Sequence, residues 1–195
     1  MDIKLFFAIS ASLIFFVSYV PYFRDIFAKK TKPHAYTWLV WAITQGTVAM
    51  GVWYGGGKFG FISFAVAVPL VVLVFLFSLH YGTRNITKAD TSALVVALLA
   101  IVVWWQLRQP LVAVFMVTAI DLIGYFPTFR KSFEEPWSET MSSWTGFIIG
   151  NYLTILALDK YNVLTLTYLI AINFANIALV AICLMRRRVI KKPAS

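Results

Sequence analysis

The chain repeats one pattern of residues at a constant offset of 106 positions. The identical residues are Tyr19 with Tyr125, Pro21 with Pro127, Phe23 with Phe129, Arg24 with Arg130, Phe27 with Phe133, and Trp38 with Trp144. The same offset aligns Thr37 with Ser143 and Gln45 with Asn151. The conserved order is a proline that ends an apolar run, a basic residue, a tryptophan and a carboxamide. Such an ungapped repeat predicts a duplicated structural unit.

The composition places this unit in a membrane. Hydrophobic residues make up 61% of the 195 residues, charged residues make up 13%, and the mean hydropathy is +0.80. A soluble domain of this size cannot bury so much apolar surface, so we expect an integral membrane protein. The net charge of +9 does not predict nucleic-acid binding, because the charges fall in short clusters between apolar runs.

Seven apolar runs have about the length of a bilayer span. They cover residues 5–23, 36–54, 59–79, 92–107, 110–126, 141–158 and 163–185. Of the 17 Lys and Arg residues, four (Lys4, Lys58, Arg108 and Lys160) fall on one side and the other thirteen on the opposite side. The basic side is expected to be cytoplasmic, which puts the N-terminus outside and the C-terminus in the cytoplasm of a cell (inner) membrane.

Both copies of the repeat then lie on the cytoplasmic side. Three spans reverse the direction of the chain, so a fourth span is needed to make two such units parallel. We therefore expect an all-α integral membrane fold of 3+1+3 helices. The parts are a triple-helix unit at 1–81, a linker helix at 82–109, a second triple-helix unit at 110–185 and a basic tail at 186–195 that contacts membrane lipid.

Two local features refine this layout. The first run could be a signal peptide, but its cleavage would cut into the repeat, so a retained helix is favoured. Gly55, Gly56 and Gly57 predict a tight turn, and so do residues 108–110.

Asp121 is the sharpest candidate for a functional residue, because it is the only acid well inside a predicted span. An ionised carboxylate there costs several kcal/mol unless it meets water, a partner or a proton. A proton-coupling role follows. The alternative is an acid that packs between helices through hydrogen bonds to Ser, Thr or Tyr.

Carboxamides and tryptophans are the candidates for solute contacts. The carboxamides offer both donors and acceptors, which suits polar solutes, although they also serve as hydrogen bonds between helices. The tryptophans could equally belong to interfacial belts. The candidates are Asn173, Asn176, Asn151, Gln45, Trp53, Trp38 and Trp144. Pro21 and Pro127 are candidate hinges, with helix termination as the alternative.

The chain resembles the PQ-loop superfamily, which includes the SWEET sugar transporters and cystinosin. The resemblance rests on residues 20–24 (VPYFR), 29–31 (KKT) and 53–55 (WYG), with 126–130 (FPTFR) in the second copy. It implies two parallel triple-helix units, alternating access and, by analogy with cystinosin, a functional acid in the fifth span. The Gln that names the group is replaced by Tyr22 and Thr128, and some SWEET prolines are absent, so sugar specificity does not carry over.

These observations favour a transporter of a small polar solute such as a sugar or an amino acid. No catalytic constellation or metal-ligand spacing lies in the spans, so we expect no enzyme activity, no cofactor and no metal. A non-transporting receptor or sensor on the same architecture stays open, and so does a vitamin transporter. A homo-oligomer is also left open.

Overall fold

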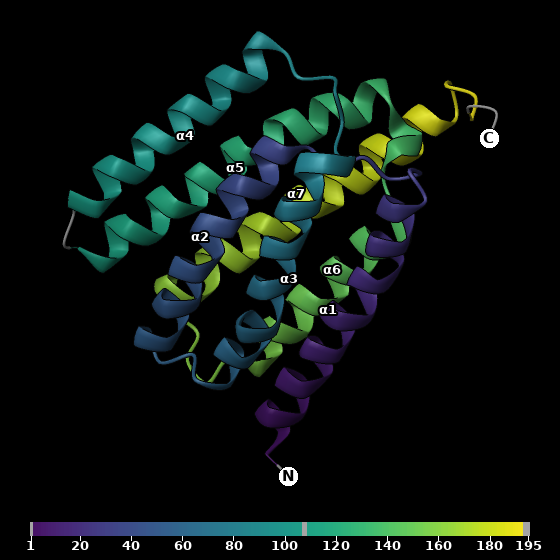
Figure 1. Cartoon of the computed structure of the whole chain (residues 1–195). Helices are drawn as coiled ribbons and strands as arrows, with labels where there is room; N and C mark the ends of the chain where they lie inside the picture. The colour runs from purple at the N-terminus through teal and green to yellow at the C-terminus, as the bar shows by residue number, and fades with distance from the viewer. Residues whose placement is uncertain (1, 107–108, 193–195) are drawn as a thin grey trace.

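The computed structural model describes residues 2–106 and 109–192. These residues form seven α-helices and one short 3-10 helix, and they include no β-strand (Figure 1). The elements are α1 (Ile3–Phe27), α2 (Ala35–Tyr54), α3 (Phe59–Tyr81), α4 (Lys88–Gln106), α5 (Pro110–Glu134), η1 (Pro136–Ser138), α6 (Met141–Ala157) and α7 (Val163–Arg187). The all-helical class expected from the sequence is confirmed.

Each predicted span corresponds to one helix. Helices α3, α5, α6 and α7 begin at the predicted residue, and α2 ends at Tyr54 before the glycine turn, in which Gly56 has φ +83°. Of the second predicted turn, residues 107 and 108 lie outside the described part of the chain.

The repeated prolines do not end their helices, so the alternative of helix termination is wrong, while the hinge role stays a prediction. Helix α1 continues past Pro21 to Phe27, and α5 continues past Pro127 to Glu134. A proline inside a helix removes one backbone hydrogen bond. Tertiary contacts beyond each proline hold the last turns in place. Phe27 packs edge-on against Phe77 and Tyr81 of α3, and Arg130 binds the start of α4.

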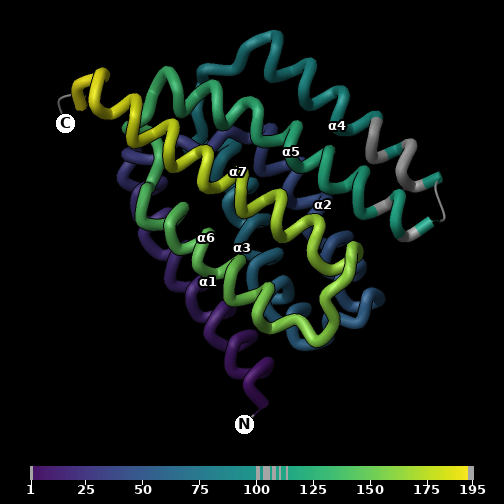
Figure 2. Tube along the Cα trace, turned by 180° about the vertical axis from the view of Figure 1, so that it is seen from behind, coloured from purple at the N-terminus to yellow at the C-terminus, as the bar shows by residue number. Residues whose placement is uncertain are grey.

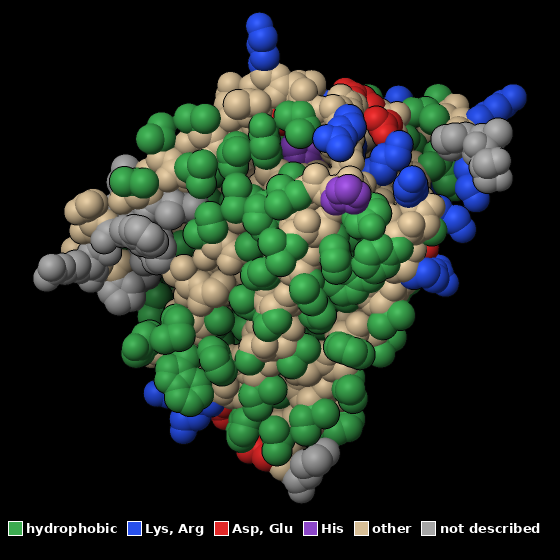
Figure 3. All heavy atoms as spheres, viewed as in Figure 1, with side chains coloured by type: hydrophobic (Ala, Val, Ile, Leu, Met, Phe, Trp, Pro, Cys, Tyr) green, Lys and Arg blue, Asp and Glu red, His purple; other side chains and the backbone are tan. Residues whose placement is uncertain are grey.

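The surface of the bundle is that of an integral membrane protein. Among the described residues, α1, α3 and α7 are each long and apolar enough to cross a membrane. Large apolar side chains such as Leu13 and Phe16 on α1 and Leu76 on α3 are exposed. Figure 3 shows hydrophobic side chains over the middle of one face, with most Lys and Arg gathered at one end. Apolar cover between charged ends is what a lipid bilayer requires.

The helices pack in a regular pattern (Figures 1 and 2). Helix α3 packs against both α1 and α2, and α7 packs against both α5 and α6. Across the molecule, α1 packs on α6 and α2 packs on α5. Helix α4 lies mainly along α5.

Hydrogen bonds gather four segments at one end of the bundle, which we call the basic pole: residues 28–34, 82–87, 135–140 and 188–192. Lys32 N donates to the Ser138 carbonyl (3.2 Å), and Thr83 N donates to the Pro33 carbonyl (3.0 Å). The Trp137 indole donates to the Ile190 carbonyl (2.9 Å). At the opposite pole, Phe59 N donates to Asp159 (3.3 Å), which joins the 55–58 turn to the 158–162 turn.

A buried ionic cluster at the basic pole attaches α4 to α5. The Arg130 guanidinium donates to both Asp90 carboxylate oxygens, at 3.0 and 2.6 Å. His34 is fully buried, with its Nε2 3.5 Å from an Asp90 oxygen. Burial lowers the pKa of His34 to about 4, against the opposing effect of Asp90. The imidazole is therefore neutral at pH 7.

The lowered pKa of His34 leads us to expect that the stability of the fold depends on pH. Its pKa is lower in the folded chain than the ordinary 6.5, so unfolded chains bind more protons as the pH falls from about 6.5 to about 4. The stability is therefore complete above pH 6.5, and about 3 kcal/mol is lost across that window. Unfolding in detergent as a function of pH measures it. His34→Gln should flatten the slope, whereas the same change at exposed His80 should not; equal slopes in all three proteins would contradict the assignment.

Candidate functional site

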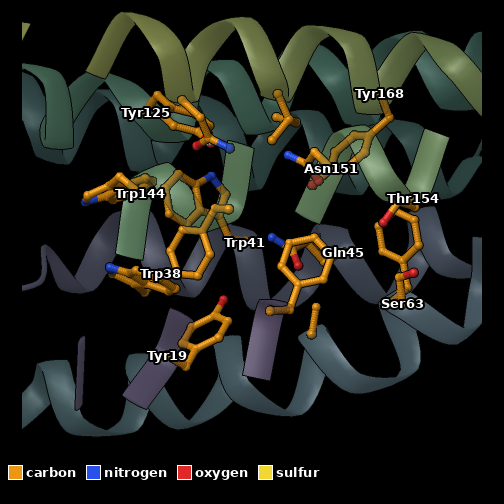
Figure 4. A pocket seen from close by; sticks show the side chains of 16 residues that line it. Tyr19, Trp38, Trp41, Gln45, Ser63, Tyr125, Trp144, Asn151, Thr154 and Tyr168 are labelled. Atoms are coloured by element: carbon orange, nitrogen blue, oxygen red, sulfur yellow. Dashed lines mark hydrogen bonds between the residues drawn. The ribbon is translucent and has the colours of Figure 1, made fainter. Parts of the chain in front are cut away.

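A cavity lies inside the bundle and is lined from six helices: α1, α2, α3, α5, α6 and α7 (Figure 4). The space open to the centres of water molecules is about 50 Å³, enough for a few waters. The lining residues are Phe15, Tyr19, Trp38, Trp41, Gln45, Ser63, Phe64, Ala67, Tyr125, Trp144, Phe147, Asn151, Thr154, Tyr168, Ile172 and Asn176.

Half of this lining consists of residues related by the 106-residue offset. The four pairs are Tyr19 with Tyr125, Trp38 with Trp144, Trp41 with Phe147, and Gln45 with Asn151. Their contacts are also equivalent. The Tyr19 ring lies 4.7 Å from the Phe147 ring, and the corresponding Tyr125 and Trp41 rings are 4.5 Å apart. The sequence repeat is therefore also a repeat of side-chain positions around the cavity.

One difference between the two halves concerns charge, at the offset-related positions Phe15 and Asp121. Phe15 lines the cavity and packs so closely on Gly150 that a Cβ there would lie 2.7 Å from its ring. The same offset relates Phe15 to Asp121 and Thr44 to Gly150, and Thr44 Oγ1 donates a hydrogen bond to Asp121. An apolar contact on one side of the cavity thus corresponds to a polar contact on the other.

Asp121 lies one side chain behind the cavity wall. It is fully buried, and its second carboxylate oxygen accepts a hydrogen bond from the hydroxyl of Tyr168 at 2.6 Å. Tyr168 itself lines the cavity. Thr44 comes from α2 and Tyr168 from α7, so the carboxyl group joins three helices. Any change in the charge of Asp121 reaches the cavity through Tyr168.

The described cavity wall combines aromatic rings with neutral polar groups and carries no charged side chain. Three carboxamides line it, from Gln45, Asn151 and Asn176. The Tyr125 hydroxyl already donates to Asn176 Oδ1 at 2.6 Å, which leaves the amide donors of Asn176 for a solute. Such a wall can stack flat or cationic groups and hydrogen-bond to a few polar atoms.

Buried residues close the cavity toward the basic pole. Trp38 and Trp144 are 2% and 1% exposed, with ring centroids 6.5 Å apart. Glu139 accepts a hydrogen bond from the Trp144 indole at 2.8 Å and forms a buried ion pair with Lys131. Lys131 also donates to the Lys32 carbonyl (2.7 Å). The closure therefore ties the 28–34 loop to α5 and α6.

Buried apolar side chains fill the opposite end, beneath turns that are also joined by hydrogen bonds such as the one from Asn162 Nδ2 to the Gly55 carbonyl (3.1 Å). Val52 of α2 and Leu158, which follows α6, are both fully buried. A Cβ at Gly57 would lie 2.7 Å from Val52 and 3.0 Å from Leu158, so this turn rests directly on both side chains. The basic pole thus contains a buried ion pair, whereas buried apolar side chains fill the other end.

Of the sequence-based candidates, five line the cavity: Trp38, Trp144, Gln45, Asn151 and Asn176. Trp53 lies outside the cavity wall: its side chain is 53% exposed and packs edge-on against Phe61 near the opposite pole, and its role in solute binding stays a prediction. Asn173 is buried but does not belong to the cavity wall, and its role also stays a prediction. Asp121 takes its place behind the wall, and Pro21 and Pro127 lie inside α1 and α5.

Several wall residues were missed from the sequence, among them Trp41, Tyr125, Tyr168 and Ser63. The offset carried a signal for two of them, because Tyr125 repeats Tyr19 and Trp41 corresponds to another aromatic residue, Phe147. Tyr168 and Ser63 have no such partner. Only the packing of α3 and α7 brings them to the cavity.

Comparisons of the chain with protein-family models, with curated proteins and with solved structures find no match. The function is therefore argued from the geometry of the cavity.

Because Lys131 and Glu139 form a buried ion pair, we expect the stability costs of substituting the two residues to be non-additive. Glu139→Gln or Lys131→Met alone leaves a buried charge without its partner and should cost about 3–5 kcal/mol of stability. The double variant should cost clearly less than the sum. Reversible unfolding in mixed detergent measures all three. Glu134→Gln, which breaks the more exposed pair with Arg130, is the control and should cost under about 1 kcal/mol. Additive costs of the two single changes would refute the buried pair.

Proposed function

We propose that this protein transports a small polar solute across the membrane by alternating access, with the solute bound in the central cavity. The observation that carries the proposal is a cavity inside the bundle, half of whose lining residues are related by the repeat offset. A site that both halves share equally can face either side when one half rocks against the other.

We propose the 3+1+3 arrangement for the helices. Two parallel units, α1–α3 and α5–α7, would be related by an axis along the membrane normal, with α4 as the linker. The packing pattern supports this: the third helix of each unit lies against the other two, and the contacts α1 on α6 and α2 on α5 exchange under the offset. The PQ-loop and SWEET-like resemblance is part of the same proposal.

The orientation proposed is N-terminus outside and C-terminus in the cytoplasm of a cell (inner) membrane. The support is the basic pole, which gathers the loops that carry most of the Lys and Arg residues, together with the basic tail. In this orientation the ionic closure around Glu139 faces the cytoplasm, and the apolar closure around Val52 faces the outside.

The transport cycle would open these closures in turn. Cytoplasmic opening separates Trp38 from Trp144 and breaks the contact between Glu139 and the Trp144 indole. Outward opening separates Val52 from Leu158. Pro21 and Pro127 lie between the cavity wall and the basic pole in their helices, where a missing backbone hydrogen bond allows bending.

Asp121 is the proposed proton-coupling residue. A neutral carboxyl group is tolerated in the buried site, whereas the ionised form needs the hydrogen bonds that Thr44 and Tyr168 donate. Protonation therefore changes the ties between α5, α2 and α7, which include a helix from each half. A proton taken up on one side and released on the other would drive the solute.

Alternating access predicts that one cavity position reacts from both sides of the membrane. In a Cys183→Ser background, Gln45→Cys should be modified by a membrane-impermeant thiol reagent added to either face of oriented proteoliposomes, and cavity-bound solute should slow both reactions. Counterflow of a metabolite panel measures transport itself. Labelling from one face only, with saturable binding but no counterflow, would overturn transport in favour of a receptor.

Proton coupling predicts a selective defect in Asp121→Asn. An asparagine keeps the size of the side chain but cannot bind and release a proton. Uptake driven by a pH gradient should fall at least about tenfold, while exchange of solute without a gradient persists. Asp159→Asn at the exposed opposite pole is the matched control. Unchanged gradient-driven uptake in Asp121→Asn would rule out the coupling role.

A further inference from the structure

The cavity has a buried acid next to its wall but no basic side chain in the described wall, and this charge distribution limits the kind of solute that can bind. Two acids contact the described wall: Glu139, which is paired with Lys131, through the Trp144 indole, and Asp121, which has no basic partner, through Tyr168. Asp121 faces Thr44 and the Trp41 indole from α2, Tyr168 from α7 and, along its own helix, Tyr125. None of these groups is a base.

Bases on the neighbouring elements lie far along the helix axes. On α5 the next base is Arg130, nine residues or about 13 Å further on, and it pairs with Asp90. Helix α2 has no Lys or Arg, and those of α7 lie in its last turn. On α4, Lys88 and Asp90 both lie in the first turn at the basic pole. The carboxylate of Asp121 thus has hydrogen-bond donors but no counter-charge.

A buried carboxylate without a counter-charge is neutralised in one of three ways: by a proton, a metal ion or a positively charged solute. A hard metal ion needs about six oxygen ligands at short distance. Around Asp121 the described oxygens are the hydroxyls of Thr44 and Tyr168, and both already donate to the carboxylate. The wall between Asp121 and the open space is aromatic, which does not suit a hard ion.

The aromatic wall does suit an organic cation. Three tryptophans and three tyrosines line the cavity: Trp38, Trp41, Trp144, Tyr19, Tyr125 and Tyr168. The faces of these rings attract ammonium groups, most strongly where water is excluded. Tyr168 donates to the Asp121 carboxylate, and the Trp41 indole donates to the backbone carbonyl of the same residue. Aromatic rings with a carboxylate behind them attract positive charge from two sources.

The same geometry disfavours a carboxylate or phosphate on the solute. No Lys, Arg or His belongs to the described wall, and every lining residue lies within a helix, where its backbone N–H is already paired. An anionic group would meet only amide and hydroxyl donors, with the charge of Asp121 nearby. Repulsion of this kind provides specificity against anions and zwitterions.

We propose that the solute class of this site is a small organic ammonium ion without a carboxylate, and that the ion and a proton compete for Asp121. The inference rests on the proposed transport function. Binding of the cation releases the proton from the carboxyl group, so the charge of the site is unchanged in total. Exchange of the two across the membrane would be antiport.

Three probes of nearly equal shape test the charge requirement. Choline is a cation, glycine betaine carries the same trimethylammonium group with a carboxylate, and dimethylbutanol replaces the choline nitrogen with carbon. Binding to the purified full-length protein is followed by tryptophan fluorescence and calorimetry. Choline should bind saturably and at least about tenfold more tightly than the other two.

Measurements at different pH values and on the Asp121→Asn variant test whether the cation and a proton compete for Asp121. Choline affinity should fall as the pH is lowered through the titration of the acid, and Asp121→Asn should bind choline and dimethylbutanol about equally. Asp159→Asn should keep the preference. Because the comparison of the three probes uses the unaltered protein, a folding defect in the variant leaves it intact.

The outcomes separate this inference from transport itself. Equal or tighter binding of glycine betaine or dimethylbutanol, or no saturable choline binding, overturns the ammonium class even if other solutes show counterflow. A choline preference that survives in folded Asp121→Asn overturns the role of the carboxylate. Charge-selective binding without counterflow keeps the ligand class and overturns transport.

Discussion

Several polar side chains buried in this apolar bundle find hydrogen-bond partners on other helices, and the arrangement of the helices depends on those pairs. Thr128 of α5 donates to Thr37 of α2 at 2.8 Å, and Tyr168 of α7 donates to Asp121 of α5 at 2.6 Å. Apolar contacts alone do not select one helix register in lipid, because lipid is as apolar as leucine. An unpaired polar group costs free energy there, so each cross-helix pair selects one register.

The positions of the helices could be read from the sequence because an apolar run long enough for a bilayer, ended by glycine or charge, has one stable conformation in lipid. Helix termination at the prolines was a plausible alternative because a proline leaves one backbone carbonyl of its helix without a hydrogen bond. Beyond Pro127, Arg130 gains two hydrogen bonds to Asp90, and beyond Pro21, Phe27 gains two aromatic contacts. Such contacts between distant segments are invisible to local spacing.

Most of the cavity residues that the sequence predicted were identified by the repeat offset. The offset pointed to Trp38 with Trp144 and to Gln45 with Asn151, and all four line the cavity. Spacing could not tell Asn176, on the wall, from Asn173, one turn earlier and outside it, because which face of α7 meets the cavity depends on its packing against α5 and α6. Trp53 lies outside the described wall, and an aromatic residue near a helix end serves an interfacial belt as readily as a pocket.

The two halves place equivalent side chains around the cavity, but they differ in charge at the offset-related positions Phe15 and Asp121. A second carboxylate at the position of Phe15 would put two like charges around one small cavity, and one of them would have to stay protonated. Phe15 instead packs on Gly150, which fills that side with an apolar ring. Glu139 is already paired with Lys131, so Asp121 is the acid beside the described wall that leaves a site for one positive charge. In the proposed cycle, that charge is a proton in one direction and the solute in the other, so the asymmetry of Phe15 and Asp121 would set a one-for-one exchange on a symmetric scaffold.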